Sequence, residues 1–205
     1  MRWPHRRSDA GQAFPIYITV VAGLLFLAFA YLAVGQAAAN RNGAQTAADA
    51  AALAAAQDTR DQLAGMWVKE LLDPTKWQDI FHGNVQGIAD SCGRAQELAA
   101  QNDAGKVQCD PVGPLSYTVA LQTNKSVGDS IVPGTEDKHS TASATAVIER
   151  LCEFELPGED AGDDVLPQLD CEDKDWDLDP DDPATLPEPK DLFDVHLADG
   201  PANDE

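Results

Sequence analysis

The sequence predicts an α+β protein: an N-terminal transmembrane helix that continues into a long Ala-rich helix, packed with a short helix and a small antiparallel sheet. Three observations lead to this fold class. Residues 14–36 form an apolar run, an alanine-rich run follows without a proline, and residues 115–123 and 140–156 alternate between apolar and polar side chains. The predicted organisation is a basic N-terminus at 1–13, a transmembrane helix at 14–36, an α+β domain at 37–157 and an acidic disordered tail at 158–205.

The apolar run has the length and composition of a membrane span. No charged residue lies between Asp9 and Arg41, and about 20 apolar residues are enough to cross the hydrocarbon core. Pro15 falls in the first turn, where the missing N–H has no partner in the helix anyway. The basic residues before the run are Arg2, Arg6 and Arg7. The positive-inside rule then predicts a single-pass protein of the cell membrane, with a cytoplasmic N-terminus and an extracytoplasmic domain.

A cleaved signal peptide is the competing interpretation of the same run. A basic region, an apolar region and a small-residue site at 37–39 are all present. However, the apolar run is longer than the 7–15 residues usual in signal peptides, and the helical pattern continues through the cleavage site. We therefore favour a retained anchor with the lipid bilayer as a partner. The alternative is a secreted acidic binding module with a weak cation-binding tail.

The alanine-rich helix has a face of small side chains. Alanine has the highest helix propensity, and Ala47, Ala50, Ala51 and Ala54 share one side at helical spacing. Small residues at this spacing allow two helices to approach closely. Two interpretations remain open: the face packs on its own domain, or it bundles with identical or related helices.

The remaining elements follow in order. Asp73-Pro74 ends the long helix, and a short turn containing Trp77 leads to a second helix at 84–100. Residues 106–109 form a short strand. The strand at 115–123 then pairs antiparallel with the one at 140–156. The core face of the 115–123 strand consists of Leu115, Tyr117, Val119 and Leu121.

The charge is strongly negative and concentrated at the C-terminus. The net charge is −21, and residues 158–205 hold 18 Asp and Glu against Lys174 and Lys190. Six prolines and few large apolar residues in the same range predict disorder. The apolar residues there, Trp176, Leu192 and Phe193, are too scattered to predict a core. Such an acidic chain has no surface suited to a phosphate backbone, which excludes nucleic acid as the expected partner.

Four cysteines, Cys92, Cys109, Cys152 and Cys171, all follow the apolar run. None is spaced C-x-x-C, so neither a zinc ribbon nor a thioredoxin motif is indicated. An even number on the side that leaves the cytoplasm predicts two disulfides, with free thiols as the alternative. Spacing does not separate the three pairings. Our prediction is that neighbours pair, Cys92 with Cys109 and Cys152 with Cys171.

No pattern in the sequence predicts catalysis or a cofactor. The histidines lie far apart and outside any zinc or nucleophile motif, and the chain has no P-loop or dinucleotide fingerprint. The one run suited to a hard cation places Asp177, Asp179, Asp181 and Glu188 at positions 1, 3, 5 and 12 of an EF-hand loop. Asp182 stands where that loop needs glycine, and Pro183 and Pro187 interrupt it. We therefore predict a non-enzymatic protein without a metal, and keep these four carboxylates as weak calcium candidates.

Residues 11–17, the apolar run and residues 41–56 together resemble the N-terminal region of the TadE/TadG-like proteins, which belong to the Flp-type (tight adherence) pilus machinery of bacteria. That region has a glycine near the membrane entry, one span, and a Q-x-A-A-D-A-A-A-L-A helix just outside. The matching residues here are Gln45, Ala47, Ala48, Asp49, Ala50, Ala51, Ala52, Leu53 and Ala54. Ile131-Val-Pro-Gly and Ala144-Thr-Ala-Val-Ile look like an actinobacterial branch of the group.

The resemblance implies a non-catalytic, single-pass membrane component of a Tad/Flp pilus or related secretion assembly, with a pilin-like extracytoplasmic domain. Its partners are expected to be other Tad/Flp membrane proteins and further copies of the chain, contacted through the alanine-rich helix. One departure narrows the role. Members processed by prepilin peptidase carry Glu at the fifth position after the cleaved glycine, and counting from Gly11 that residue is Ile16. An uncleaved accessory protein of the TadG type therefore fits better than a pilus subunit.

Overall fold

The computed structural model describes residues 13–126, 137–158, 166–182 and 185–198 and confirms the α+β class. A long helix, α1 (Ala13–Lys69), is followed by short helices and two antiparallel sheets. The other elements are η1 (Pro74–Lys76), α2 (Trp77–Phe81), α3 (Cys92–Gln101), β1 (Ala104–Pro111), β2 (Ser116–Ser126), β3 (His139–Arg150), β4 (Cys152–Phe154), β5 (Leu169–Cys171), β6 (Asp175–Trp176), α4 (Pro189–Leu192) and β7 (Phe193–Leu197).

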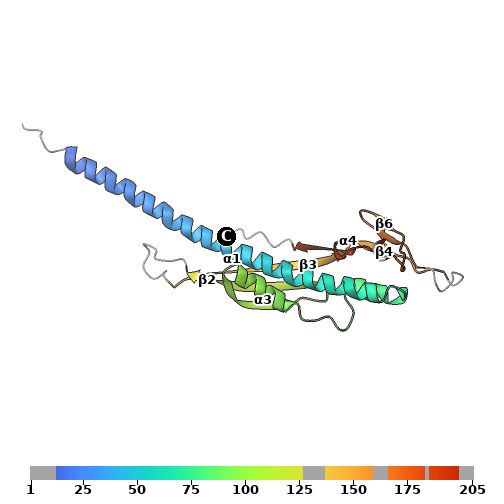
Figure 1. Ribbon diagram of the computed structural model, residues 1–205. Coiled ribbons are helices and arrows are strands. Elements are labelled where there is room, and N and C mark those ends of the chain that lie inside the picture. The colour runs from blue at the N-terminus through green and yellow to red at the C-terminus, as the bar shows by residue number, and fades with distance from the viewer. Residues whose placement is uncertain (1–12, 127–136, 159–165, 183–184, 199–205) are drawn as a thin grey trace, which may run out of the picture.

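Helix α1 runs for 57 residues without a break and divides into two segments. The apolar segment, residues 14–36, extends beyond the rest of the molecule, whereas the domain segment, residues 37–69, lies along the sheet (Figure 1). The domain segment packs against β2, β3 and α3. The helix ends at Lys69, four residues before the Asp73-Pro74 stop that the sequence predicts. Pro74, five residues after Lys69, begins a new 3-10 turn.

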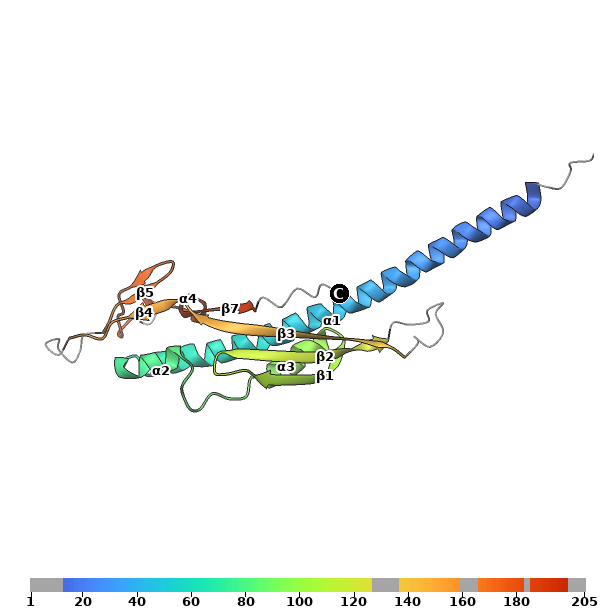
Figure 2. The same ribbon diagram turned by 180° about the vertical axis from the view of Figure 1, so that it is seen from behind.

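The main sheet has the order β1-β2-β3-β7 and is antiparallel throughout. Figure 2 shows β1, β2 and β3 side by side beneath α1. Cys109 of β1, Val119 of β2 and Ala144 of β3 lie opposite one another. The alternation predicted for β2 is confirmed, since Tyr117, Val119 and Leu121 are buried. The predicted antiparallel pairing of the 115–123 and 140–156 segments is also confirmed.

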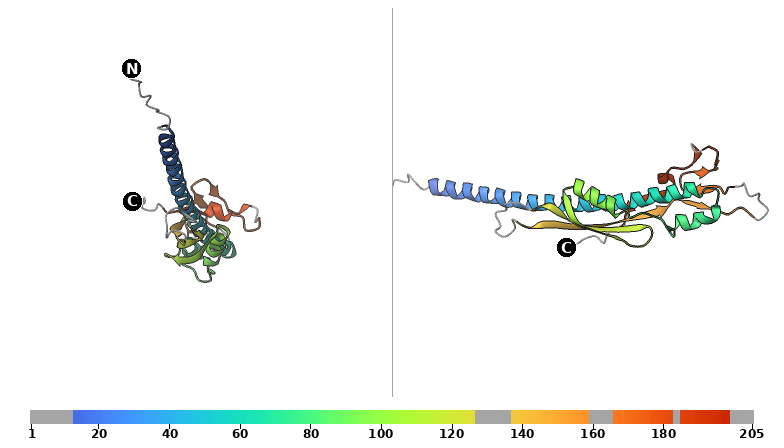
Figure 3. Two further views of the ribbon diagram at one scale, coloured as in Figure 1. Left: turned by 90° about the vertical axis from the view of Figure 1, so that its left-hand side faces the viewer. Right: turned by 60° about the horizontal axis from the view of Figure 1, so that its bottom comes forward.

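The core changes in character along α1. Beside the middle of the sheet it is made mostly of alanines from α1 and α3 against β-branched and aromatic residues of β2 and β3. At the end far from the apolar segment, large rings take over, with neighbouring centroids 5.3–5.9 Å apart in tilted or edge-on arrangements. These rings belong to Trp67, Trp77, Phe81, Phe154 and Phe193. The views in Figure 3 place α2 and the small β4-β5-β6 sheet at this same end.

Both predicted disulfides are confirmed. Cys92–Cys109 joins the first residue of α3 to β1, and Cys152–Cys171 joins β4 to β5. The described part of the chain contains no free cysteine. The bonds close loops with sequence separations of 17 and 19. In the chain-entropy account, loops of that length stabilise a fold by about 3 kcal/mol each.

The second helix is shorter than predicted. Sequence periodicity predicts it at 84–100, but α3 begins only at Cys92. Gly83 and Gly87 have φ angles of +68° and +94°, which a right-handed helix does not allow. A side chain at Gly83 would also collide with Pro114. Residues 83–91 therefore form an irregular connection in place of the first two turns of that helix.

The prediction of a disordered tail at 158–205 is wrong for the residues described there, 166–182 and 185–198. Strand β7 pairs with β3, with Phe193 opposite Arg150. Leu192 and Phe193 are fully buried, and α4 begins with a capping box between Glu188 and Asp191. Composition averaged over the segment hides the fact that its few apolar residues come together at one place, where they complete a sheet already built upstream. The remaining tail positions lie outside the described residues.

Candidate membrane and assembly interface

The apolar segment of α1 has no partner of its own in the described structure. Apart from half-buried Val21, the large apolar residues from Phe14 to Val34 are 49–83% exposed, and none of the most apolar 18-residue stretch is buried. The hydroxyl of Thr19 donates to the carbonyl oxygens of Ile16 and Pro15, at 2.8 and 3.1 Å, so this polar group needs no water. Length and composition make this segment a candidate membrane span.

The signature residues of the domain segment fall into two groups. The side chains of Ala47, Ala48 and Ala51 are fully buried, and Ala54 is 9% exposed. Asp49, Ala50 and Leu53 are half-buried, and Gln45 is exposed. Because alanine ends at Cβ, these positions let α1 lie close to β2, β3 and α3. The alanine face therefore packs on its own domain. Contact with other subunits stays a prediction, and only the residues left exposed are free to make it.

Gln45 and Asp49, the polar residues of the signature, help to attach α1 to β3. The Gln45 amide donates to the Asp49 carboxylate at 2.8 Å, one helical turn away. The same nitrogen lies 3.5 Å from the backbone oxygen of Ser143, on β3. These contacts hold the start of the domain segment, next to the apolar segment, against β3.

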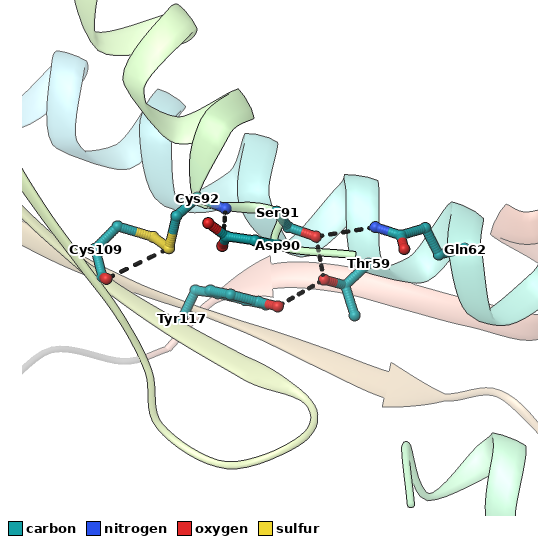
Figure 4. Close-up of a disulfide and its surroundings, with 7 residues drawn as sticks. All are labelled: Thr59, Gln62, Asp90, Ser91, Cys92, Cys109 and Tyr117. Atoms are coloured by element: carbon teal, nitrogen blue, oxygen red, sulfur yellow. Dashed lines mark hydrogen bonds between the residues drawn. A yellow bond between two sulfur atoms is a disulfide. The ribbon is translucent and has the colours of Figure 1, made fainter. Parts of the chain in front are cut away.

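A buried polar cluster, missed by sequence reasoning, fixes α1 in register with α3 and β2 (Figure 4). Thr59 lies 2.7 Å from the Ser91 hydroxyl and donates to the Tyr117 hydroxyl at 2.8 Å. Gln62 donates to the Ser91 hydroxyl at 3.2 Å. The donors therefore run in one direction, from Gln62 through Ser91 and Thr59 to Tyr117. The sequence contains one indication that Thr59 is buried: it follows Ala51 and Ala55 at helical spacing and so lies on the same face as these buried alanines.

The irregular 83–91 connection is attached to this cluster. The backbone N–H of Ala89 donates to the Gln62 side-chain oxygen at 2.6 Å, and the Cys92 N–H donates to Asp90 at 2.9 Å. The Cys92 sulfur lies 3.3 Å from the carbonyl oxygen of Cys109. A disulfide sulfur has no proton to donate, so that approach is a contact rather than a hydrogen bond. Together these interactions bind α1, α3 and β1 into one unit.

An exposed ion-pair network lies where α1 ends. Lys76 contacts Glu70 at 2.6 Å and Asp73 at 3.3 Å. The hydrogen bond from the Thr75 hydroxyl, helped by Lys76, lowers the pKa of Asp73 below its usual range. The hydrogen bond to Glu70, followed by that to Asp73, raises the pKa of Lys76. Solvent screens these exposed groups, so their role is to position the turn rather than to stabilise the fold strongly.

The four weak calcium candidates do not converge. Asp177 accepts a hydrogen bond from Gln168 at 3.0 Å, and Asp179 accepts one from the backbone of Asp181 at 2.9 Å. Glu188 pairs with Lys190 at 2.9 Å, which raises the pKa of that lysine. Among the described residues, no group of three or more His, Cys, Asp or Glu side chains is arranged to hold a metal ion.

The described histidines serve local contacts. The ring of His82 contacts the Gln78 carbonyl oxygen at 2.7 Å, that of His139 the Thr123 carbonyl oxygen at 2.8 Å, and that of His196 the Asp194 carboxylate at 3.0 Å. None of them is paired with a nucleophile in the part of the chain that the structure describes. There is thus no positive evidence of catalysis.

The fold and the site define an α+β domain carried on a long helix whose free half has the character of a membrane span. Residues 11–58 match the family model described as "Putative Flp pilus-assembly TadE/G-like". No curated protein and no solved structure matches the chain. The TadE/TadG-like resemblance is confirmed over the N-terminal region, whereas the actinobacterial branch stays a prediction.

The matched region coincides with the two features described above. It covers the apolar segment and the signature helix as far as Asp58, one residue before the buried polar cluster begins at Thr59. The family match and the candidate membrane helix together support a membrane-located component of pilus assembly.

Proposed function

We propose that this protein is a non-catalytic, single-pass membrane component of a Tad/Flp-type pilus or related secretion assembly. Residues 1–13 face the cytoplasm, residues 14–36 cross the bilayer, and the domain stands outside. The observation that carries the proposal is the continuity of α1. A mostly exposed apolar segment passes without interruption into a signature helix that packs on its own domain.

Two features support this orientation. Arg2, Arg6 and Arg7 precede the span, and basic residues remain on the cytoplasmic side. The two disulfides lie in the domain, and disulfides persist in oxidising compartments outside the cytoplasm. Both arguments support the same orientation, with the domain outside the cytoplasm.

The proposed partners are other membrane proteins of the assembly and further copies of this chain. The exposed surface available to them includes the apolar segment and a shallow groove of about 350 Å³ between α1 and α3. Half-buried Ala50, Leu53 and Leu98 contribute to that groove. In this proposal the alanine face holds the domain rigid, and the residues beside it meet the partner.

Intact mass and thiol labelling of the protein in its native membrane test this proposal. We expect full-length protein in the carbonate-resistant membrane fraction. After mild reduction of intact cells, Cys92 and Cys109 should react with a maleimide that does not cross membranes. A mature start near Ala38 to Arg41 would support the secreted alternative and contradict the anchor. Labelling only after cell lysis would reverse the proposed orientation.

A further inference from the structure

An open groove of about 650 Å³ lies at the end of the domain where the apolar segment leaves it. It begins beside Arg41 of α1 and crosses the outer face of β1, β2 and β3. Its described lining residues are Arg41, Asn42, Gln45, Lys106, Gln108, Ala120, Leu121, Gln122, Thr141, Ala142 and Ser143. Most of them are polar, and the eight that belong to the strands lie outside the residues that match the family model.

Among the described residues, the sheet is incomplete at this end. Strand β7 pairs with β3 over residues 146–150, and the Ala198 N–H donates to the Thr145 carbonyl oxygen, whereas α1 is the described neighbour of β3 at Ser143. Gln45 approaches the Ser143 carbonyl oxygen there. Residues 41–45 of α1 thus border the outer face of the sheet, and the first turn outside the predicted span reaches the groove.

Lys106 occupies this groove through an irregular backbone. The β1–β2 register shifts between Gly105 and Gln108, which is the mark of a bulge. Lys106 has a φ of +49°, a conformation that side chains other than Gly and Asn adopt at a cost. Gly105 next to it has the Asn124 side chain only 2.8 Å from where a Cβ would stand. The chain therefore accepts strain at the residue that brings a cation to the groove.

The charge of the groove is opposite to that of the whole chain. The chain has 35 Asp and Glu against 14 Lys and Arg, yet the described lining contains two cations and no carboxylate. Neither Arg41 nor Lys106 forms an ion pair within the described residues. The Asp49 carboxylate accepts a hydrogen bond from the lining residue Gln45, and Asp103 pairs with Lys125 at 2.9 Å. The two cations outnumber the single carboxylate of Asp49, so the described groove and its border keep a net positive charge.

The groove begins at the outer border of the headgroup layer. Arg41 follows the end of the predicted span at residue 36 by five residues, which is about 7.5 Å along a helix. The headgroup layer adds roughly 5–7 Å to each side of the hydrocarbon core. The long side chain of Arg41 can reach back from that border to lipid phosphates, and the groove opens from it.

We propose that this groove binds the phosphate headgroup of an anionic phospholipid in the leaflet next to the domain. Arg41 offers its planar guanidinium to two phosphate oxygens, and Lys106 adds a point charge. The amides and hydroxyls of Gln108, Gln122 and Thr141 suit the hydroxyls of a glycerol headgroup. This inference rests on the proposed function, because it requires residues 14–36 to span the bilayer.

Native mass spectrometry of the full chain, released from detergent with added phosphatidylglycerol or phosphatidylcholine, tests the proposal. We expect preferential retention of phosphatidylglycerol. Arg41→Gln and Lys106→Gln should each weaken it about fivefold, which corresponds to about 1 kcal/mol for one basic residue at an anionic surface. Lys69→Gln is the matched control, since Lys69 is an exposed cation at the opposite end of the domain segment. It should leave retention unchanged, and circular dichroism should confirm that all variants are folded.

Equal retention of the two lipids, or full retention by folded Arg41→Gln and Lys106→Gln, would overturn the proposal. Displacement of the lipid by millimolar inorganic phosphate would also overturn it, because the site would then take free phosphate. Loss of crosslinks to neighbouring subunits in these variants, with unchanged lipid retention, would assign the groove to an acidic protein partner instead. Carbonate extraction of membranes that contain the same variants distinguishes failure of this inference from failure of the proposed function. A protein that stays in the membrane without lipid preference defeats this inference alone, whereas one that is extracted defeats the proposed function.

Discussion

The two segments of α1 belong to one continuous helix but meet opposite surroundings. In the apolar segment, residues as large as Phe14 and Tyr31 are 71% and 83% exposed, whereas in the domain segment Ala47 and Ala51 are fully buried. Large apolar residues are commonly buried in folded proteins, so their exposure in the apolar segment needs a separate explanation. The two segments therefore differ in their surroundings: the apolar segment has the character of a membrane span, whereas residues 47–56 present buried alanines to the domain, and Leu63 and Trp67 are buried farther along.

Introducing a charge into the apolar segment should have the largest effect, because it opposes insertion into the membrane. For Leu27→Arg, we expect insertion into the membrane to become less favourable by about 3 kcal/mol, the range for arginine near a helix centre. The carbonate-resistant fraction of the protein measures this loss. The domain should keep its thermal stability, since Leu27 is 64% exposed and contacts no other element of the domain.

Thr46→Arg is the matched control, because Thr46 lies on the exposed side of the domain segment. It should change neither membrane retention nor stability. If Leu27→Arg remained as well inserted as Thr46→Arg, the apolar segment would not be a span.

Replacing an alanine by leucine should have the next largest effect, and it should destabilise the domain only when the alanine lies in the domain segment. Ala51→Leu adds three carbons to a fully buried site between α1 and the sheet, and such overpacking costs roughly 1–3 kcal/mol. The same substitution in the apolar segment, Ala28→Leu, has an exposed site and should cost nothing. Thermal unfolding of the two variants, followed by circular dichroism of the domain, measures the difference. Equal melting temperatures would mean that the alanine face does not pack as described.

The smallest expected effect concerns the polar cluster at the far end of that face. Thr59→Val keeps the shape but removes the hydroxyl between Ser91 and Tyr117. Leaving buried groups without a partner costs about 1–2 kcal/mol. Chemical denaturation compares it with Thr46→Val, the same change at an exposed site, which should be neutral within about 0.5 kcal/mol. A Thr59→Val protein as stable as that control would show that the cluster does not stabilise the register of α1.

Local sequence patterns were sufficient to predict α1 and the alternation of β2. The charge-free run, the absence of proline between Pro15 and Pro74, and the alternation around Val119 are local patterns, and all three agree with the structure. The disulfide pairing was a choice among three, and it proved correct because neighbouring cysteines are brought together by adjacent elements.

The missed features depend on contacts between distant residues. The start of α3 is set by glycines with positive φ and by Gln62, 27 residues before Ala89. Phe193 is buried because β3 offers it an edge and Phe81 a ring, 5.3 Å between centroids. The cationic groove combines residues from α1 and three strands. Neither composition nor periodicity contains such information.

Because α1 is unbroken, a change in the tilt of the apolar segment would also move the domain. The domain segment is about 50 Å long at 1.5 Å per residue, and its sheet, α3 and polar cluster prevent it from bending independently of the domain. A change of about 20° in the tilt of the span, the average tilt of membrane helices, would therefore move the aromatic far end sideways by roughly 17 Å. If the proposed span is correct, small changes in its tilt would in this way reposition the surface around the aromatic end of the domain.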